Sequence, residues 1–217
     1  MKNIAVIARK GGSGKTTVAV NLALAAHRRG YAVELADTDP QGSSAEVLKV
    51  RKGEGPTVVQ TTGEALFASR HRPHPGIGLR VLDTPAAAED TIGHAIALAQ
   101  VSILVVRPTF LDLAATLQTA QILRRLRRPG LILLNQAPVT RGGVEPPAVK
   151  RALDALRLMQ LPVLPVILRA RAAYQTSLAL GCSVEELGPG PAADEIAQLW
   201  SYLERFALGV GRSTEAA

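Results

Sequence analysis

Short apolar runs alternate with longer amphipathic segments along most of the chain. The runs predict strands over residues 4–8, 31–36, 57–60, 79–83, 101–107, 131–134 and 162–167. Helices are predicted over residues 18–29, 44–50, 64–70, 89–100, 111–126, 148–159, 174–180 and 192–208. This alternation is typical of an α/β protein, a doubly wound and mostly parallel sheet with helices on both faces.

The length of 217 residues suits one domain, which we place at residues 1–208, followed by a small polar tail at 209–217. The longest apolar runs are too short to cross a membrane. Met1 runs almost directly into the first strand, and we expect no signal peptide. The lone Cys182 excludes an intrachain disulfide. We therefore expect a cytoplasmic protein.

The charge balance narrows the choice of partners only slightly. Lys and Arg number 25 against 18 Asp and Glu, a formal net charge of +7. A basic protein can bind nucleic acid or an anionic membrane, and the balance alone does not choose between them.

The stretch with the strongest chemical signal is R-K-G-G-S-G-K-T-T at residues 9–17, between the first strand and the first helix. Glycines there let successive backbone N–H groups turn toward phosphate oxygens, and the helix start adds its own free N–H groups. Lys15 can reach the β- and γ-phosphates, and Thr16 can offer its hydroxyl to Mg²⁺. The phosphate contacts are expected from Gly11, Gly12, Ser13, Gly14, Lys15, Thr16 and Thr17. The usual G-x-x-x-x-G-K-[ST] pattern has a glycine where this chain has Arg9.

Three carboxylates follow predicted strands downstream of this loop. Asp37 and Asp39 end the second strand, and Asp83 ends the apolar strand 79–83. The carboxyl ends of parallel strands meet at one edge, where such folds bind ligands. Each Asp alone could be a loop or helix-capping residue. Together behind a phosphate loop, they predict groups that hold Mg²⁺ and orient a water for phosphoanhydride hydrolysis.

The order of these motifs resembles the ParA/MinD family of deviant Walker ATPases. The matching segments are K-G-G-S-G-K-T-T, D-T-D-P-Q-G-S, L-D-T-P, R-P-T-F-L-D from Arg107 and the C-terminal stretch from Arg171 to Val184. The resemblance covers roughly residues 1–190, and the short chain looks most like the small ParA partition proteins of plasmids. It departs from the family at Ala86, where a second proline is usual.

The resemblance implies a P-loop NTPase that uses ATP and Mg²⁺ and forms an ATP-dependent homodimer. Lys10 would be the signature lysine that reaches the partner's nucleotide, and Asp39 the aspartate that promotes hydrolysis. Asp37 would lie near Mg²⁺, and Asp83 would be the Walker B residue at the start of switch II, residues 83–90. Asn135 matches a position that commonly contacts adenine, although a strand-end turn residue explains it equally well.

By the same resemblance, we expect a slow, partner-stimulated ATPase that binds DNA non-specifically, associates with the nucleoid and segregates plasmid or chromosomal DNA. Arg169 and Arg171 are the preferred DNA contacts, with further candidates at Arg124, Arg125, Arg127, Arg128, Lys150 and Arg151. The activating partner would be a centromere-binding or cargo-adaptor protein. The sequence leaves open a protein cargo, such as a chemoreceptor cluster or a microcompartment.

Two other classes fit less well. A MinD-like membrane-cycling ATPase needs a basic amphipathic helix at its C-terminus, and residues 209–217 carry one cation, one anion and no apolar face. A nitrogenase-reductase-like protein needs several cysteines to bind its cluster, and a synthetase needs insertions for which 217 residues leave little room.

Overall fold

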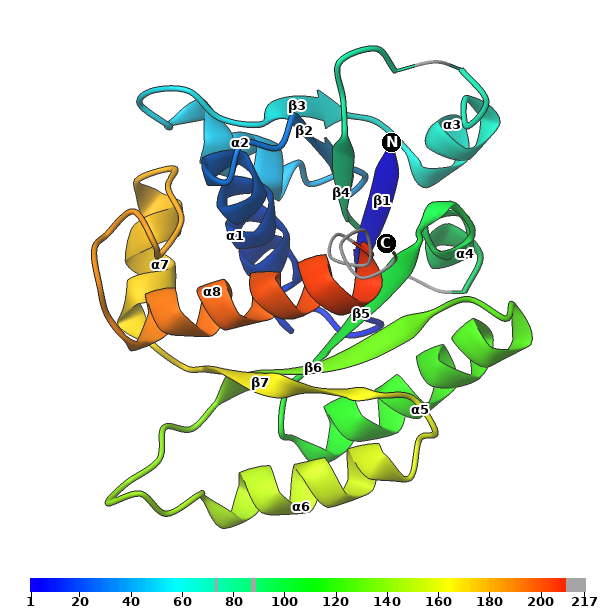
Figure 1. Cartoon of the computed structure of the whole chain (residues 1–217). Coiled ribbons are helices and arrows are strands. Elements are labelled where there is room, and N and C mark those ends of the chain that lie inside the picture. Colours follow the sequence, from blue (N-terminus) through cyan, green and yellow to red (C-terminus); the bar gives the residue numbers. More distant parts are fainter. Residues whose placement is uncertain (73, 87–88, 210–217) are drawn as a thin grey trace, which may run out of the picture.

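A parallel β-sheet forms the centre of the computed structural model, which describes residues 1–72, 74–86 and 89–209 (Figure 1). Within these residues, seven strands lie in the order β3-β2-β4-β1-β5-β6-β7. They are β1 (Lys2–Ile7), β2 (Val33–Asp37), β3 (Thr57–Gln60), β4 (Leu79–Asp83), β5 (Val101–Val106), β6 (Gly130–Ala137) and β7 (Val163–Arg169). Every strand pair is parallel, as the alternating pattern predicted.

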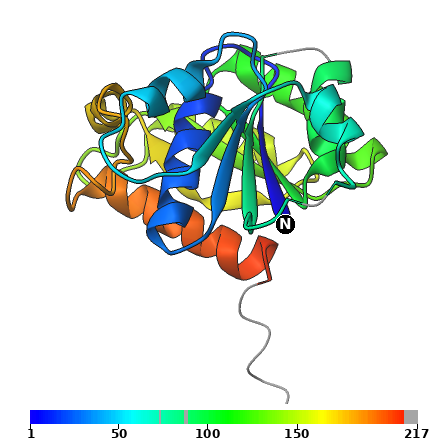
Figure 2. The same cartoon turned by 90° about the horizontal axis from the view of Figure 1, so that it is seen from above.

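Helices cover both faces of the sheet (Figure 2). They are α1 (Lys15–Arg28), α2 (Ser43–Lys49), α3 (Gly63–Ala68), α4 (Glu89–Leu98), α5 (Phe110–Arg125), α6 (Pro147–Arg157), α7 (Ala172–Ala179) and α8 (Pro191–Tyr202), with a π-helical turn η1 (Leu203–Ala207). One apolar cluster joins α1 and α8 to the sheet, and a second joins α4, α5 and α6 to the opposite face. The fold is therefore the predicted doubly wound α/β domain.

The predicted elements are all present, and the differences lie at their ends. The first helix begins at Lys15 rather than at residue 18, because the glycine loop turns directly into it at Gly14. Strand β6 continues to Ala137, three residues beyond its apolar run. The last predicted helix ends at Tyr202 and continues as η1. Residues 210–217 of the predicted tail lie outside the described residues.

Strand order brings the predicted motifs to one edge of the sheet. Val6 of β1 lies beside Asp83 of β4, and Asp83 lies beside Asp37 of β2. The glycine loop after β1 therefore lies next to both acidic strand ends. Among the described residues, no helix is long and apolar enough to cross a membrane.

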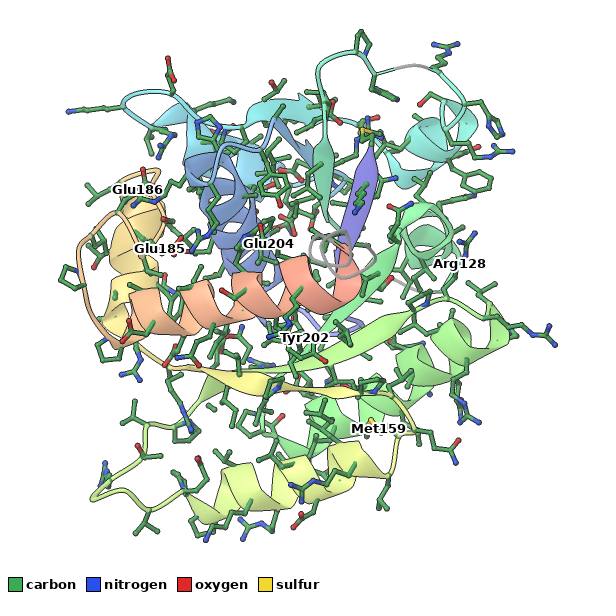
Figure 3. The ribbon with its side chains drawn as sticks, in the orientation of Figure 1. Arg128, Met159, Glu185, Glu186, Tyr202 and Glu204 are labelled. Atoms are coloured by element: carbon green, nitrogen blue, oxygen red, sulfur yellow. The ribbon has the colours of Figure 1, made fainter. Side chains whose placement is uncertain are left out.

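Ion pairs tie the C-terminal segment to the start of the chain. Glu185 accepts two hydrogen bonds from Arg29, at 2.7 and 2.9 Å. Glu186 accepts two from Arg51, at 2.8 and 3.1 Å. Both glutamates follow α7 in the chain, and Figure 3 labels them beside that helix. These pairs join the segment after α7 to the residues that follow α1 and α2.

Candidate nucleotide-binding site

The P-loop, residues 9–17, has the conformation that its glycines allow. Gly12 and Gly14 have φ angles of 73° and 91°, in the left-handed region that other residues rarely adopt. Lys15 starts α1, and its side chain is buried. Burial lowers the pKa of Lys15, and the nearby carboxylates of Asp83 and Asp39 oppose that shift. The loop therefore presents a buried lysine at the start of a helix, as a polyphosphate site requires.

Lys10 differs from Lys15 in its surroundings. Lys10 and the neighbouring Arg9 are exposed. An exposed lysine at this point can reach a second molecule, in keeping with the role that the resemblance implies for it.

Asp83 is buried at the end of β4, with no exposed surface. Neither of its carboxylate oxygens has a hydrogen-bond partner among the described residues. Burial raises the pKa of Asp83 to about 7, and the Asp37 carboxylate adds to this rise. The hydroxyls of Thr16 and Ser44, which lie near the carboxylate without forming a hydrogen bond to it among the described residues, and the Lys15 ammonium oppose it. A buried carboxylate without a partner is costly, and a cation or its water shell is the natural ligand to satisfy it.

Asp37 and Asp39 shape the loop after β2. Asp37 accepts hydrogen bonds from the backbone N–H groups of Asp39 at 3.1 Å and Ala45 at 3.0 Å. Asp39 is partly exposed and accepts one bond from the N–H of Gln41 at 2.9 Å. Asp37 is therefore largely committed to its own loop, whereas Asp39 keeps oxygen lone pairs available for a water.

Two threonines join the three strand ends. Thr38 donates both its backbone N–H and its hydroxyl to the carbonyl oxygen of Asp83, at 2.9 and 2.8 Å. Thr84 donates its hydroxyl to the carbonyl oxygen of Val6 at 2.8 Å. The segments after β2, β4 and β1 are thus connected by hydrogen bonds from buried side chains. The expected switch II segment begins here, and residues 87 and 88 of it lie outside the described residues.

The other flank of the P-loop is held by β6. Asn135 is buried, and its Nδ2 donates to the carbonyl oxygen of Ser13 at 2.7 Å. Gln136 donates from Nε2 to the carbonyl oxygen of Gly12 at 2.9 Å. The sequence pointed to Asn135 as an adenine contact or a turn residue; in the structure its amide binds the P-loop backbone. Gln136 was missed, and only its place beside Asn135 could have drawn attention to it.

Arg107 is a second residue whose position the sequence did not reveal. It follows β5, and its guanidinium lies beside Gly12, 3.5 Å from where a β-carbon would be. Buried Asp112 accepts two hydrogen bonds from it, at 3.1 and 3.2 Å. Its place in R-P-T-F-L-D was part of the family resemblance, but no feature of that segment indicated contact with the P-loop.

A cavity of about 350 Å³ opens next to the P-loop helix. Thr17, Asn135, Gln136, Arg169, Ala170, Arg171, Ala172, Tyr174 and Gln175 line it. Its volume is in the range of small-ligand sites. It adjoins the P-loop at Thr17, so a nucleoside can occupy it while its phosphates lie in the loop.

The two arginines expected to contact DNA line this cavity and are paired with carboxylates. Arg169 donates to both oxygens of Glu145, at 2.6 and 2.8 Å. Arg171 donates to Glu195 at 2.8 Å, and Tyr174 donates to the other oxygen of Glu195 at 2.9 Å. The pairing holds the pKa of Glu145 below its usual value. A DNA contact by Arg169 or Arg171 would compete with these pairs, and their role in DNA binding stays a prediction.

The donor set fits Mg²⁺ and ATP. Mg²⁺ is usually bound by one hydroxyl or carboxylate together with phosphate oxygens and water, not by a complete protein cage. Thr16 and the Asp83 carboxylate, which has no hydrogen-bond partner among the described residues, would provide that partial set. Among the described residues, no group of three His, Cys, Asp or Glu side chains could hold a metal by itself. The site therefore suits a metal that arrives with a nucleotide.

Known proteins are similar to this chain in sequence or in fold. Maintenance of carboxysome distribution protein A from Halothiobacillus neapolitanus is 31% identical over 208 residues, covering 90% of this chain and 93% of that protein. The ATP complex of Cyanothece McdA superposes with a TM-score of 0.78 at 17% identity, covering 96% of each chain. The Mg-ADP complex of the septum site-determining protein MinD from Pyrococcus horikoshii superposes with a TM-score of 0.77 at 20% identity, covering 95% of this chain and 97% of that chain.

A family model described as the CobQ/CobB/MinD/ParA nucleotide binding domain matches residues 4–190. That span contains the P-loop, all three site aspartates and the β6 amides. The chain therefore belongs to the CobQ/CobB/MinD/ParA family of nucleotide-binding domains, and its P-loop is of the deviant Walker A type.

Proposed function

We propose that this protein is an ATPase that dimerises on ATP, binds DNA non-specifically through the dimer, and uses hydrolysis to position a protein cargo on the nucleoid. The observation that carries the ATPase assignment is the buried carboxylate of Asp83, which lies close to Lys15 of the P-loop and has no hydrogen-bond partner in the described part of the chain. Such an arrangement leaves a charge for a metal and its nucleotide to satisfy.

The residues have distinct roles in this proposal. Lys15 and the P-loop N–H groups hold the phosphates, and Thr16 with Asp83 holds Mg²⁺, which neutralises phosphate charge when bound. Asp39 orients the attacking water. Lys10 reaches the nucleotide of the second molecule, so the site is complete only in the dimer.

The choice of a protein cargo rests on the match to the Halothiobacillus protein, which covers nearly the full length of both chains. Segregation of plasmid or chromosomal DNA, the leading expectation from the sequence, becomes the second candidate. It keeps support from a 47% identity to the Chromosome-partitioning ATPase Soj of Thermus thermophilus, although that match covers only 25% of this chain.

We place the DNA contact on the layer of α5 and α6. Residues 107–160 contain nine Arg or Lys and three Asp or Glu, so this layer carries +6 of the net +7. Arg107 and Arg157 are paired with Asp112 and Asp154. Five exposed cations of this layer, which we call the basic surface, lie in two places: Arg124, Arg127 and Arg128 around the end of α5, and Lys150 and Arg151 in the first half of α6.

The experiment is binding to random-sequence duplex DNA with ATP, ADP or no nucleotide, over a range of salt concentrations. We expect binding only with ATP, weakening steeply with salt because phosphate neutralisation drives it. Replacing Arg127, Arg128, Lys150 and Arg151 with Gln should flatten the salt dependence by about 0.9 in slope per lost contact. The matched control neutralises four exposed cations elsewhere, Arg28, Lys49, Lys52 and Arg72.

Each result has a clear meaning. Loss of DNA binding in both variants would show a general charge effect and remove the basic surface from the proposal. An ATP dimer that binds no DNA at any salt concentration would overturn the DNA component, and vesicles of anionic lipid would be the next partner to test.

The cargo is tested in the source cell by deleting the gene. A protein cargo predicts mispositioned or clustered protein assemblies with normal plasmid retention and chromosome content. Plasmid loss or cells without chromosomes would favour the second candidate.

A further inference from the structure

The P-loop backbone is held in place by two amides from a distant part of the chain. Gln136 Nε2 donates to the carbonyl oxygen of Gly12 at 2.9 Å, and Asn135 Nδ2 donates to that of Ser13 at 2.7 Å. The bonds join segments more than 120 residues apart in sequence. Consecutive carbonyls of the loop are thus both directed at the end of β6.

Directing these carbonyls also directs the N–H groups. In a trans peptide the C=O of one residue and the N–H of the next point in opposite directions. With the Gly12 and Ser13 carbonyls turned toward β6, the N–H groups of Ser13 and Gly14 point away from β6. These are N–H groups that a polyphosphate needs, and they are oriented before any ligand binds.

The arrangement is maintained against local strain. Gln136 has a φ of 51°, in the left-handed region, and lies where the pairing of β6 with β7 shifts register between Leu134 and Ala137. Gly14 has no room for a side chain, since a β-carbon there would lie 2.3 Å from Asn135 Nδ2. A non-glycine residue in this conformation persists only where the surrounding structure holds it, and here its side chain binds the P-loop.

We infer that Asn135 and Gln136 are positioning residues that preset the P-loop for polyphosphate, independently of the base. This rests on the proposed function, because it assigns a role within the same nucleotide site. It differs from the adenine contact implied for Asn135, because the side-chain hydrogen bond that Asn135 makes among the described residues goes to the Ser13 carbonyl oxygen. We call the pair the amide latch.

The test compares a ligand that has a base with one that lacks it. Binding of Mg-ATP and of Mg-tripolyphosphate is measured calorimetrically for Asn135→Ala and Gln136→Met, which remove the donors without adding charge. The matched control is Gln198→Met, which makes the same substitution at an exposed residue of α8 that is not part of the cavity lining.

We expect each latch variant to lower the affinity for ATP and the affinity for tripolyphosphate by equal factors. The factor should be about tenfold for the variant of buried Asn135 and about threefold for that of exposed Gln136. Gln198→Met should change neither affinity more than about twofold. Exchange of the backbone N–H groups of residues 12–14 should speed up in both latch variants while the melting temperature of Gln136→Met stays that of the wild type.

Three results would contradict the inference or its basis. If Asn135→Ala lowers the affinity for ATP but leaves the affinity for tripolyphosphate unchanged, Asn135 recognises the nucleoside and the positioning role inferred for it is wrong. If Gln136→Met behaves like Gln198→Met, its hydrogen bond has no positioning role. If the wild type binds neither ligand, the nucleotide assignment itself fails.

Discussion

The P-loop has two flanks that differ in chemistry. On the carboxylate side, Asp37, Asp39 and Asp83 bring acidic groups to the ends of β2 and β4, and Asp83 has no hydrogen-bond partner among the described residues. On the amide side, the latch pairs neutral groups with backbone carbonyls. One flank keeps unsatisfied charge, while the other uses its donors to shape the loop.

The difference separates two requirements of a nucleotide site. Binding needs a backbone already in the right conformation, because ordering a loop on binding lowers affinity. Hydrolysis needs charge placed where the metal and water will lie, which costs stability in the empty protein. Changes on the carboxylate side should therefore affect turnover, and changes on the amide side should affect affinity.

The largest expected effect is that of Asp39→Ala. Removing the group that orients water should lower kcat roughly 100-fold or more while ATP binding and dimerisation persist. Single-turnover hydrolysis measures the chemical step directly, and light scattering measures the dimer. Normal turnover in this variant would transfer the role to another carboxylate.

Lys10→Ala tests whether one molecule alone forms a complete nucleotide site. Lys10 is exposed, so its loss should leave nucleotide affinity of the monomer within about threefold and abolish the ATP dimer. Lys15→Ala is the contrasting variant and should lose nucleotide binding altogether. A Lys10→Ala protein that still dimerises with ATP would remove the trans role.

Asp83→Asn should separate stability from activity. The folded pKa of Asp83 is raised to about 7 from an ordinary 3.8. The folded state therefore binds more protons than the unfolded state between these values, and wild-type stability should fall as pH rises from about 4 to 7. In EDTA without nucleotide, the variant should melt higher than wild type at pH 8 and similarly at pH 4, although it loses Mg²⁺-dependent hydrolysis. Equal melting at both pH values would mean that the buried charge has no such effect.

The smallest effect should come from Glu145→Gln, next to the amide side. It weakens the pair with Arg169 and should reduce the free energy of unfolding by about 1 kcal/mol or less at neutral pH. Because pairing lowers the pKa of Glu145 from 4.5, this contribution is present above that value and is lost as pH falls below it. ATP affinity should not change. A clear loss would mean that the ion pairs, and not the latch alone, set the conformation of the P-loop.

The sequence revealed the carboxylate side more completely than the amide side. The P-loop and the D-T-D-P-Q-G-S and L-D-T-P segments each carry their chemistry in consecutive residues, and parallel strands bring their ends together. Gln136 and Arg107 depend on contacts between segments 95 residues or more apart, which no local pattern encodes. Arg169 looked available for DNA because Glu145, which pairs with it, lies 24 residues away in sequence.

The hydrogen bonds of Thr38 to Asp83 have a mechanical consequence. The loop after β2 is anchored on the carbonyl of the same residue whose side chain faces the nucleotide site. A displacement of the loop after β2 or of the loop after β4 stretches the same two hydrogen bonds, so the two loops are expected to move as one rigid body. A partner protein that binds to one of these loops would then move both together. Every partner of the dimer would therefore meet the two loops in one common conformation, set by the bound nucleotide.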